Sequence, residues 1–252
     1  MARSLAHSIA AIEQRVFFPV ISEIKLRTPK DGDLLQGRPP AELARRMARC
    51  PIAGLSVVTE SESFGGSLDL LGEIASVMEV PILQKDFIKT RTQIEESKEL
   101  GASAILLIAS ILEDKTLIDL QNFSHRLGLE TVVEVHTEKE LQRVRNFHFH
   151  LDLLGINNRD ITVLETDDSD VTVTERLLRG RQRSKGENIP TESTEREPLI
   201  LSESSLQGKE DLRRAFEAGA DAVLIGTAVM QAQNTEAFLW ELIRREARNG
   251  PS

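Results

Sequence analysis

Short apolar runs recur along this chain, and between them lie segments with the apolar spacing of an amphipathic helix. The runs are nearly continuous rather than alternating, which is typical of parallel strands that are buried on both faces. They predict strands at residues 20–25, 54–58, 80–85, 104–108, 131–135, 152–157, 199–203 and 222–226. Helical patterns fill the intervals, at residues 39–49, 67–77, 90–100, 114–127, 137–146, 172–178, 208–218 and 235–248.

This alternation of strand–helix pairs favours an α/β fold in which eight strands close into one (β/α)8 barrel, the TIM-barrel architecture. A doubly wound open sheet is the alternative, but it usually has fewer strands and a glycine-rich first turn, which this sequence does not contain. The length of 252 residues suits a single barrel domain. Residues 1–18 predict a short N-terminal helix, and the polar residues 180–198 predict an exposed loop at the end of the barrel away from its mouth.

Composition excludes several classes of protein. The formal net charge of −9 argues against a nucleic-acid partner, although a local cluster of Lys and Arg could still bind an anionic substrate. No apolar run approaches the roughly 18 residues of a membrane span, and no targeting segment stands out. The single cysteine, Cys50, rules out an internal disulfide and fits a reducing cytoplasm.

Five of the predicted strands end in side chains that can do chemistry. In chain order these ends hold Glu23 and Lys25; Lys85 and Phe87; Glu134; Asn157 and Arg159; and Glu203 and Ser204. A lysine at the end of a buried strand is costly unless something uses it. The carboxyl ends of all strands in a parallel barrel surround one mouth, where barrel enzymes do their chemistry. These residues are therefore expected to converge on one site.

The same segments carry a family resemblance. They are Ser22-Glu-Ile-Lys25, Ser56-Val-Val-Thr-Glu60 with Phe64-Gly-Gly-Ser-Leu68, Lys85-Asp-Phe87, Val133-Glu-Val-His136, Gly155-Ile-Asn-Asn-Arg-Asp160 and Ser202-Glu-Ser204. In this order the chain resembles the indole-3-glycerol phosphate synthase family, from about Val20 to about Met230. The resemblance implies a carboxy-lyase of tryptophan biosynthesis that acts on a small phosphorylated substrate. That family closes a five-membered ring in a carboxyphenylamino-deoxyribulose phosphate, then releases carbon dioxide and water, and needs no metal or organic cofactor.

The resemblance also implies roles for the charged residues at the mouth. Lys85 is expected to be the general acid at the substrate carbonyl, with a pKa lowered by desolvation. Glu134 is expected to be its acid–base partner and Glu23 to assist dehydration, each with a raised pKa in a partly dry site. The alternative is that Glu23 and Glu134 have no catalytic role and serve only as counter-ions to Lys25 and Lys85.

Further residues are expected to bind or orient the substrate. Lys25 would attract the departing carboxylate, while Asn157 and Glu203 would orient hydroxyl groups and the lysines. Arg159 would bind the anthranilate carboxylate or brace loops. Ser204 would line the wall. Phe87 and Leu106 would form the slot for the aromatic ring, or belong to the barrel core.

The phosphate is expected over the loops that follow the seventh and eighth strands, where backbone N–H groups are available in such barrels. This points to Ser204, Ser205, Gly226 and Thr227, with the loop of Thr28 closing from the other side. Ser205 stands where the family usually has glycine, so a turn that requires positive φ would be strained there.

The chain departs from the family pattern in other ways. Only about 19 residues precede the first strand, so the family's covering helix is shortened, and Ala10, Ile12, Val16 and Phe17 of the N-terminal segment could pack across the mouth instead. These differences keep open a related phosphate-binding barrel, isomerase or aldolase-like, that acts on another sugar phosphate. A catalytically silent barrel that serves as a binding subunit is a third hypothesis.

Two remaining expectations concern the histidines and assembly. The two histidines of Phe147-His-Phe-His150 have strand spacing but no third ligand nearby, so no metal site is expected, and His136 is expected to support Glu134. A monomer or weak homo-oligomer is expected, with no nucleic-acid or membrane partner.

Overall fold

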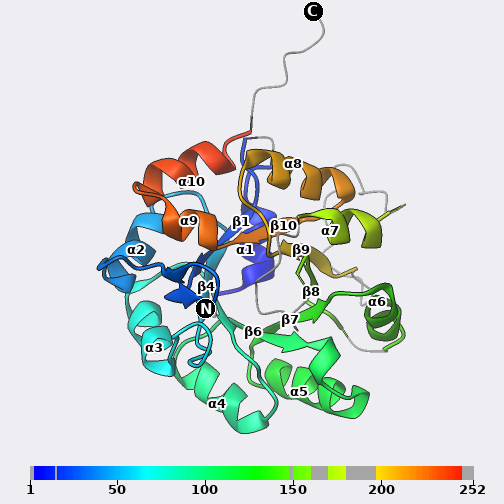
Figure 1. The fold of residues 1–252 in the computed structure, drawn as a ribbon. Coiled ribbons are helices and arrows are strands. Elements are labelled where there is room, and N and C mark those ends of the chain that lie inside the picture. Colours follow the sequence, from blue (N-terminus) through cyan, green and yellow to red (C-terminus); the bar gives the residue numbers. More distant parts are fainter. Residues whose placement is uncertain (1–2, 15, 148–149, 160–169, 180–196, 246–252) are drawn as a thin grey trace, which may run out of the picture.

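The computed structural model describes residues 3–14, 16–147, 150–159, 170–179 and 197–245. Its centre is a closed barrel of parallel strands, hydrogen-bonded in the order β1-β10-β9-β8-β7-β6-β5-β4 (Figure 1). The strands are β1 (Val20–Ile24), β4 (Gly54–Val58), β5 (Ile82–Lys85), β6 (Ala104–Ile108), β7 (Glu130–Val135), β8 (Leu153–Asn157), β9 (Leu199–Glu203) and β10 (Ala222–Ile225).

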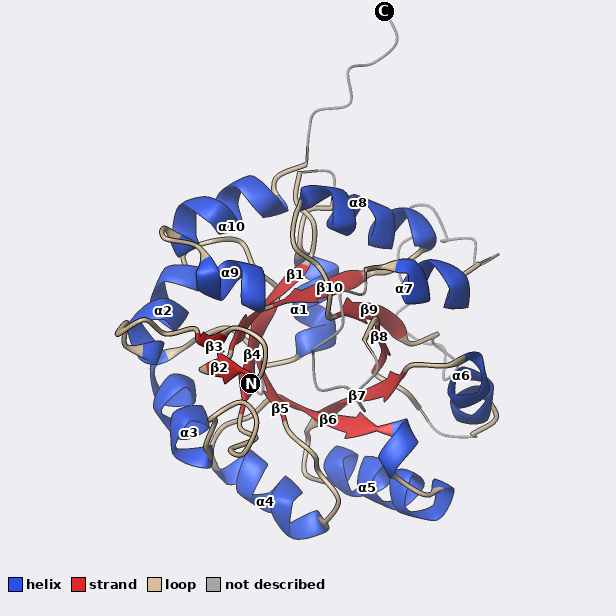
Figure 2. Cartoon of the chain, in the orientation of Figure 1, coloured by secondary structure: helices blue, strands red, loops and turns tan. Residues whose placement is uncertain are grey.

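Helices form a ring outside the strands (Figure 2). They are α2 (Pro40–Met47), α3 (Leu68–Val77), α4 (Arg91–Glu99), α5 (Asp114–Arg126), α6 (Glu138–Arg145), α7 (Thr172–Leu177), α8 (Lys209–Ala218) and α10 (Thr235–Ile243). The (β/α)8 barrel expected from the sequence is thus confirmed, with element ends shifted by a few residues. Of the exposed loop expected at 180–198, residues 180–196 lie outside the described residues.

Short elements that the apolar pattern did not predict follow three of the strands. They are the antiparallel pair β2 (Arg27–Thr28) and β3 (Gly32–Asp33), the 3-10 turn η1 (Ala109–Ile111) and the short helix α9 (Thr227–Gln231). They come directly after β1, β6 and β10, so they lie at the carboxyl end of the barrel. Elements this short have too few apolar positions to show a period in the sequence.

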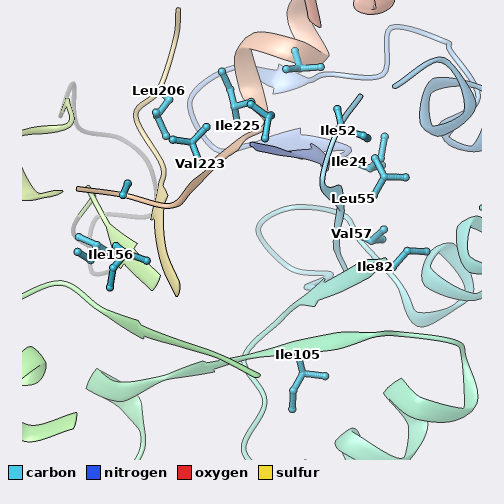
Figure 3. Close-up of a cluster of buried hydrophobic side chains, with 14 of the residues drawn as sticks. Ile24, Ile52, Leu55, Val57, Ile82, Ile105, Ile156, Leu206, Val223 and Ile225 are labelled. Atoms are coloured by element: carbon cyan, nitrogen blue, oxygen red, sulfur yellow. The ribbon is translucent and has the colours of Figure 1, made fainter. Parts of the chain in front are cut away.

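Each strand buries both of its faces, which explains the continuous apolar runs. In β6, Ala104, Leu106 and Ile108 belong to the cluster that fills the barrel interior. Ile105 and Leu107 belong to the layer between strands and helices, part of which is drawn in Figure 3. Successive side chains of a strand point to opposite faces, so a strand between two apolar layers needs an apolar residue at every position.

The N-terminal helix α1 (Leu5–Ala11) closes the barrel at the end opposite the mouth. Leu5 and Ile9 are fully buried and join the interior cluster. Leu5 packs so closely on Gly54, the first residue of β4, that a Cβ atom there would lie 2.8 Å from Leu5 Cδ1. Glu130, at the start of β7, accepts a hydrogen bond of 2.6 Å from the Ser4 hydroxyl and bonds from the backbone N–H groups of Leu5 and Ala6.

The expectation that the N-terminal segment packs across the mouth is therefore wrong. Ala10 and Val16 are exposed, and Phe17 packs edge-on against Trp240 with ring centroids 6.0 Å apart. An amphipathic pattern shows that a helix has an apolar face, but both ends of a barrel offer an apolar surface to cover. The partly buried carboxylate of Glu130 decides between them, because it satisfies the N–H groups that the start of α1 leaves unpaired.

We expect Glu130→Ala to lower the free energy of unfolding by about 1–2 kcal/mol, because the first turn of α1 loses its acceptor. Chemical denaturation measures the change. The control is Glu96→Ala on the exposed face of α4, which should differ from wild type by less than about 0.5 kcal/mol. Equal stability of the two variants would show that Glu130 does not anchor α1.

Candidate active site

A pocket of about 630 Å³, here named the inner pocket, opens at the carboxyl ends of the strands. Its walls include Glu23, Lys25, Lys85, Phe87, Leu106, Glu134, Asn157, Arg159 and Ser204, all singled out from the sequence. Val58, Glu60, Phe64, Asp86 and Ile108 complete the lining. Residues up to 181 positions apart in the chain, from Glu23 to Ser204, therefore meet at one site.

Buried charges form the floor of this pocket. Lys85 Nζ lies 2.9 Å from Glu203 Oε2 and 4.0 Å from Glu23 Oε2. Lys25 Nζ lies 3.3 Å from Glu23 Oε1, and the Ser56 hydroxyl lies 3.4 Å from the other oxygen of Glu23. Glu23 thus bridges the two lysines, and the fully buried Glu203 holds Lys85 from below.

The environment of Lys85 holds it in the charged form. Burial alone would lower the pKa of Lys85, but the carboxylates of Glu203, Glu23 and Glu134 more than offset this and raise the pKa above its ordinary value. The sequence-based expectation of a lowered lysine pKa is therefore wrong. Desolvation follows from the buried strand itself, but the carboxylates around the ammonium group come from other strands, so only the fold reveals them.

At this site, Glu203 is the carboxyl group whose pKa burial raises to a value near neutral pH. Burial raises the pKa of Glu203 to about 7, and the negative charges of Glu134 and Glu23 add to the rise while Lys85 opposes it. Glu134 behaves in the opposite way. Burial would raise its pKa, but His136, Lys85 and Asn157 together hold the pKa below its ordinary value. The raised pKa expected for Glu134 is therefore wrong.

His136 supports Glu134, as expected from its place two residues further along the strand. Its Nε2 atom lies 3.3 Å from Glu134 Oε1, and its Nδ1 atom lies 3.5 Å from Glu140 Oε2. The same carboxylate of Glu140 accepts a 2.8 Å hydrogen bond from the backbone N–H of His136. The first turn of α6 thereby sets the position of the imidazole beside Glu134.

The upper wall of the inner pocket is apolar. Phe87 and Leu106 both line it, and Phe64, which the sequence analysis quoted only within a motif, lies with its ring centroid 5.6 Å from Lys25 Nζ. Glu60 shapes the loop that carries Phe64, since its carboxylate accepts the backbone N–H groups of Glu62, Ser63 and Phe64 at 2.8–3.1 Å. Phe64 lies six residues beyond β4, so a search restricted to strand ends does not find it.

A second hollow of about 1120 Å³, the outer pocket, adjoins the inner one and shares Glu23, Lys25, Lys85, Arg159 and Ser204 with it. Four of the residues expected at the phosphate line it, namely Ser204, Ser205, Gly226 and Thr227. Thr28 does not line either pocket. It is buried, and its hydroxyl is 2.9 Å from Asp31 Oδ2 and accepts the backbone N–H of Asp31. Lys30 and Asp31 of the same loop line the outer pocket instead.

The turn after β9 is strained. Ser204 and Ser205 have φ angles of 66° and 61°, in the left-handed region that favours glycine. The hydroxyl of Ser205 accepts a 3.1 Å hydrogen bond from Arg159 Nε, and the Arg159 N–H donates to Asn157 Oδ1 at 3.0 Å. The strain expected from a serine at a family glycine position is thus present, and the same serine contacts Arg159.

Asn158, which the sequence analysis did not single out, holds this turn in place. Its side-chain amide donates to the carbonyl oxygens of Glu203 and Ser204 at 3.0 and 3.2 Å, and to the Ser202 hydroxyl at 3.1 Å. Its own carbonyl oxygen accepts the N–H and the hydroxyl of Thr174. Nothing in the sequence distinguishes this asparagine from its neighbour Asn157, which lines the pocket.

Metal-binding geometry does not occur in the described part of the chain, where no three or more His, Cys, Asp or Glu side chains gather as ligands. Residues 148–149 of the histidine motif lie outside that part. No helix there combines the length and apolar character needed to cross a bilayer.

Comparisons with known proteins agree on one family. The model of the family described as Indole-3-glycerol phosphate synthase matches residues 1–242. A protein of that name from Pyrococcus furiosus is 41% identical over 90% of this chain and 92% of its own length. A second, from Thermococcus kodakarensis, is 39% identical over 98% of this chain and 100% of its own length.

A solved structure supports the fold alone. The N-acetylmannosamine-6-phosphate 2-epimerase from Clostridium perfringens is similar with a TM-score of 0.59, over 83% of this chain and 86% of that one. Only 16% of the aligned residues are identical, so this similarity concerns the barrel and not the chemistry at its mouth.

We expect Ser205→Gly to be more stable than Ser205→Ala by about 1 kcal/mol, because both lose the hydroxyl but only glycine adopts the positive φ without a steric penalty. Urea denaturation of both variants measures the difference. If the two free energies of unfolding coincide, the turn relaxes on substitution and the left-handed conformation stores no strain.

We expect Glu203→Gln to change how stability depends on pH. The folded-state pKa of Glu203, about 7, lies above the ordinary value of 4.5, so between these values the folded protein keeps a proton that the unfolded chain has lost. The contribution of Glu203 to the free energy of unfolding therefore falls as pH rises through this window. The glutamine variant does not titrate at this position and so does not show this loss. The variant should gain stability relative to wild type from about pH 5 to about pH 8.

Denaturant unfolding at several pH values across the window measures this difference. The exposed Glu96→Gln serves as the matched control and should track wild type throughout. Parallel stability curves for Glu203→Gln and wild type would contradict a raised pKa at Glu203.

Proposed function

The chain belongs to the indole-3-glycerol phosphate synthase family, and from this premise we propose how its site performs the family's reaction. The protein is a carboxy-lyase of tryptophan biosynthesis. It converts 1-(2-carboxyphenylamino)-1-deoxyribulose 5-phosphate to indole-3-glycerol phosphate, carbon dioxide and water. The reaction needs a proton donor at a carbonyl oxygen, a group that assists dehydration, and cations for a carboxylate and a phosphate.

Lys85 is the general acid in this proposal. The observation that carries it is the lysine's position, at the end of β5 in the pocket floor, within 2.9 Å of Glu203 and 4.0 Å of Glu23. These carboxylates keep the ammonium group protonated until the substrate carbonyl presents its oxygen. As the ring closes, the carbonyl oxygen gains negative charge, its pKa rises, and proton transfer from Lys85 becomes favourable.

The carboxylates divide the remaining proton transfers. Glu134, held ionised beside His136, accepts a proton as the partner of Lys85. Glu23, bonded to Lys25, assists the loss of water from the ring-closed intermediate. Lys25 attracts the carboxylate that leaves as carbon dioxide. Glu203 orients Lys85 from below, and Asn157 orients the hydroxyl groups of the sugar-derived chain.

The two pockets divide the substrate between them. The apolar wall of Phe87, Leu106 and Phe64 takes the aromatic ring, while Arg159 faces its carboxylate. The phosphate lies in the outer pocket near Ser205, Gly226 and Thr227, with Lys30 supplying a cation from the loop after β1. Thr28 acts there indirectly, because its hydroxyl shapes the turn that carries Lys30.

The composition of the chain also bears on the compartment and the partners of the enzyme. We propose that it works in the cytoplasm as a monomer or weak homo-oligomer, with no cofactor, nucleic acid or membrane partner. The buried thiol of Cys50, which forms no disulfide, and the acidic net charge of −9 support this setting.

We expect Lys85→Met to lower kcat on the order of 10²–10⁴-fold, because the substrate carbonyl loses its proton donor while the apolar stem of the side chain is kept. The assay follows the indole fluorescence of the product from the carboxyphenylamino-deoxyribulose phosphate. Lys89→Met, an exposed lysine four residues further on, is the control and should keep wild-type kcat. Turnover by Lys85→Met at the wild-type rate would remove Lys85 from the mechanism, and an inactive wild type would remove the lyase function.

A further inference from the structure

Arg38 joins two distant segments of the chain. Its guanidinium group donates to the carbonyl oxygens of Leu34 and Leu35 at 2.7 and 2.9 Å, close to it in sequence. It also donates to the carbonyl oxygens of Met230 and Ala232, the latter at 3.1 Å, which lie at the end of α9. Arg38 is half-buried, and it does not appear among the residues that line either pocket.

Both segments form part of the outer pocket. The loop after β1 brings Lys30 and Asp31 to one side of it. The segment that begins at Gly226 and continues through α9 to Ala232 forms another side. Arg38 does not line the pocket but bonds to both segments, so it ties the two walls together without touching what the pocket holds.

The loop on the Arg38 side needs such an anchor because its backbone is strained. Gln36 and Gly37 both have positive φ, at 51° and 76°. The Asp33 carboxylate accepts the backbone N–H groups of Leu35 and Gln36 at 2.9 and 3.2 Å, which shapes the turn but only from within the loop. A non-glycine residue stays in the left-handed region only where its surroundings hold it there.

The α9 side needs an anchor for a different reason. A helix of five residues has little stability of its own, and the carbonyl groups of its last turn have no partners inside the helix. A guanidinium group can satisfy several carbonyls at once, because it carries five N–H donors in a rigid plane and remains charged at all relevant pH values. A lysine at this position would reach fewer of them.

We propose that Arg38 is a positioning residue for the phosphate end of the substrate, which it serves by holding the loop after β1 against α9. The proposal rests on the lyase function and on the phosphate binding in the outer pocket. Loss of Arg38 should free Lys30 and the loop from the pocket wall, which weakens phosphate binding while the proton donors at the inner pocket stay in place.

The test compares Arg38→Met and Arg38→Lys with wild type. We expect Arg38→Met to raise KM for the carboxyphenylamino-deoxyribulose phosphate roughly tenfold, and to raise the inhibition constant of inorganic phosphate by a similar factor. The value of kcat should stay within about threefold of wild type, and Arg38→Lys should recover part of the lost affinity. Arg46→Met, an exposed arginine on α2 that pairs with Glu42, is the matched control and should behave as wild type.

Amide hydrogen exchange provides a readout that needs neither substrate nor turnover. Exchange in residues 30–37 and 227–232 should be faster in Arg38→Met than in Arg46→Met, with the barrel strands unchanged. Unchanged exchange in those two segments, or a fall in kcat with KM and phosphate inhibition unaltered, would overturn the proposal. An inactive wild type would count against the lyase function alone, since the exchange comparison would still show whether Arg38 holds the two segments together.

Discussion

Closure of the barrel is the constraint on which the rest of this structure depends. β1 pairs with β10 on one side, with Val20 opposite Val223, and with β4 on the other, with Ile21 opposite Gly54. The eight strands of the barrel run in parallel, so closure brings the carboxyl end of each to one rim and the start of each to the other. The rim at the carboxyl ends receives the charged side chains, while the opposite rim is closed by α1.

Burying charged side chains at this rim is energetically costly. Burial, together with the nearby carboxylates of Glu134 and Glu23, raises the pKa of the fully buried Glu203 to about 7. Lys85 stays charged because Glu203, Glu23 and Glu134 surround it. A buried group with such a perturbed pKa is a common mark of an active site. The same holds for the backbone of Ser204 and Ser205, whose left-handed conformation is kept by the hydrogen bonds of the buried Asn158. The buried charges and the strained backbone of the turn after β9 therefore lie at the same site.

Features of the fold and the site are predictable from the sequence where their signal is local or repeats along the chain. Strands such as β6 are readable because both of their faces are buried, so every position is apolar. Lys85 and Glu203 are readable because each interrupts such a run at its end. Phe64, Lys30 and Asn158 were not singled out, because they lie in loops whose paths depend on distant contacts. Two of the hydrogen bonds of Arg38, to Met230 and Ala232, span more than 190 residues of sequence, and no pattern within one segment indicates them.

The sequence alone determined the alternation of strands and helices, the barrel, the family, and the set of polar residues at the strand ends, because burial on two faces and short motifs are properties of neighbouring residues. Tertiary structure alone decided which end of the barrel α1 covers and which carboxyl group at the mouth has a raised pKa. Both outcomes depend on groups brought together from different strands. A pKa is set by the charges within a few ångströms in space, and the position of a helix by the partner that satisfies its free N–H groups. Neither the shift of the pKa nor the position of the helix is fixed until the chain has folded into the closed barrel.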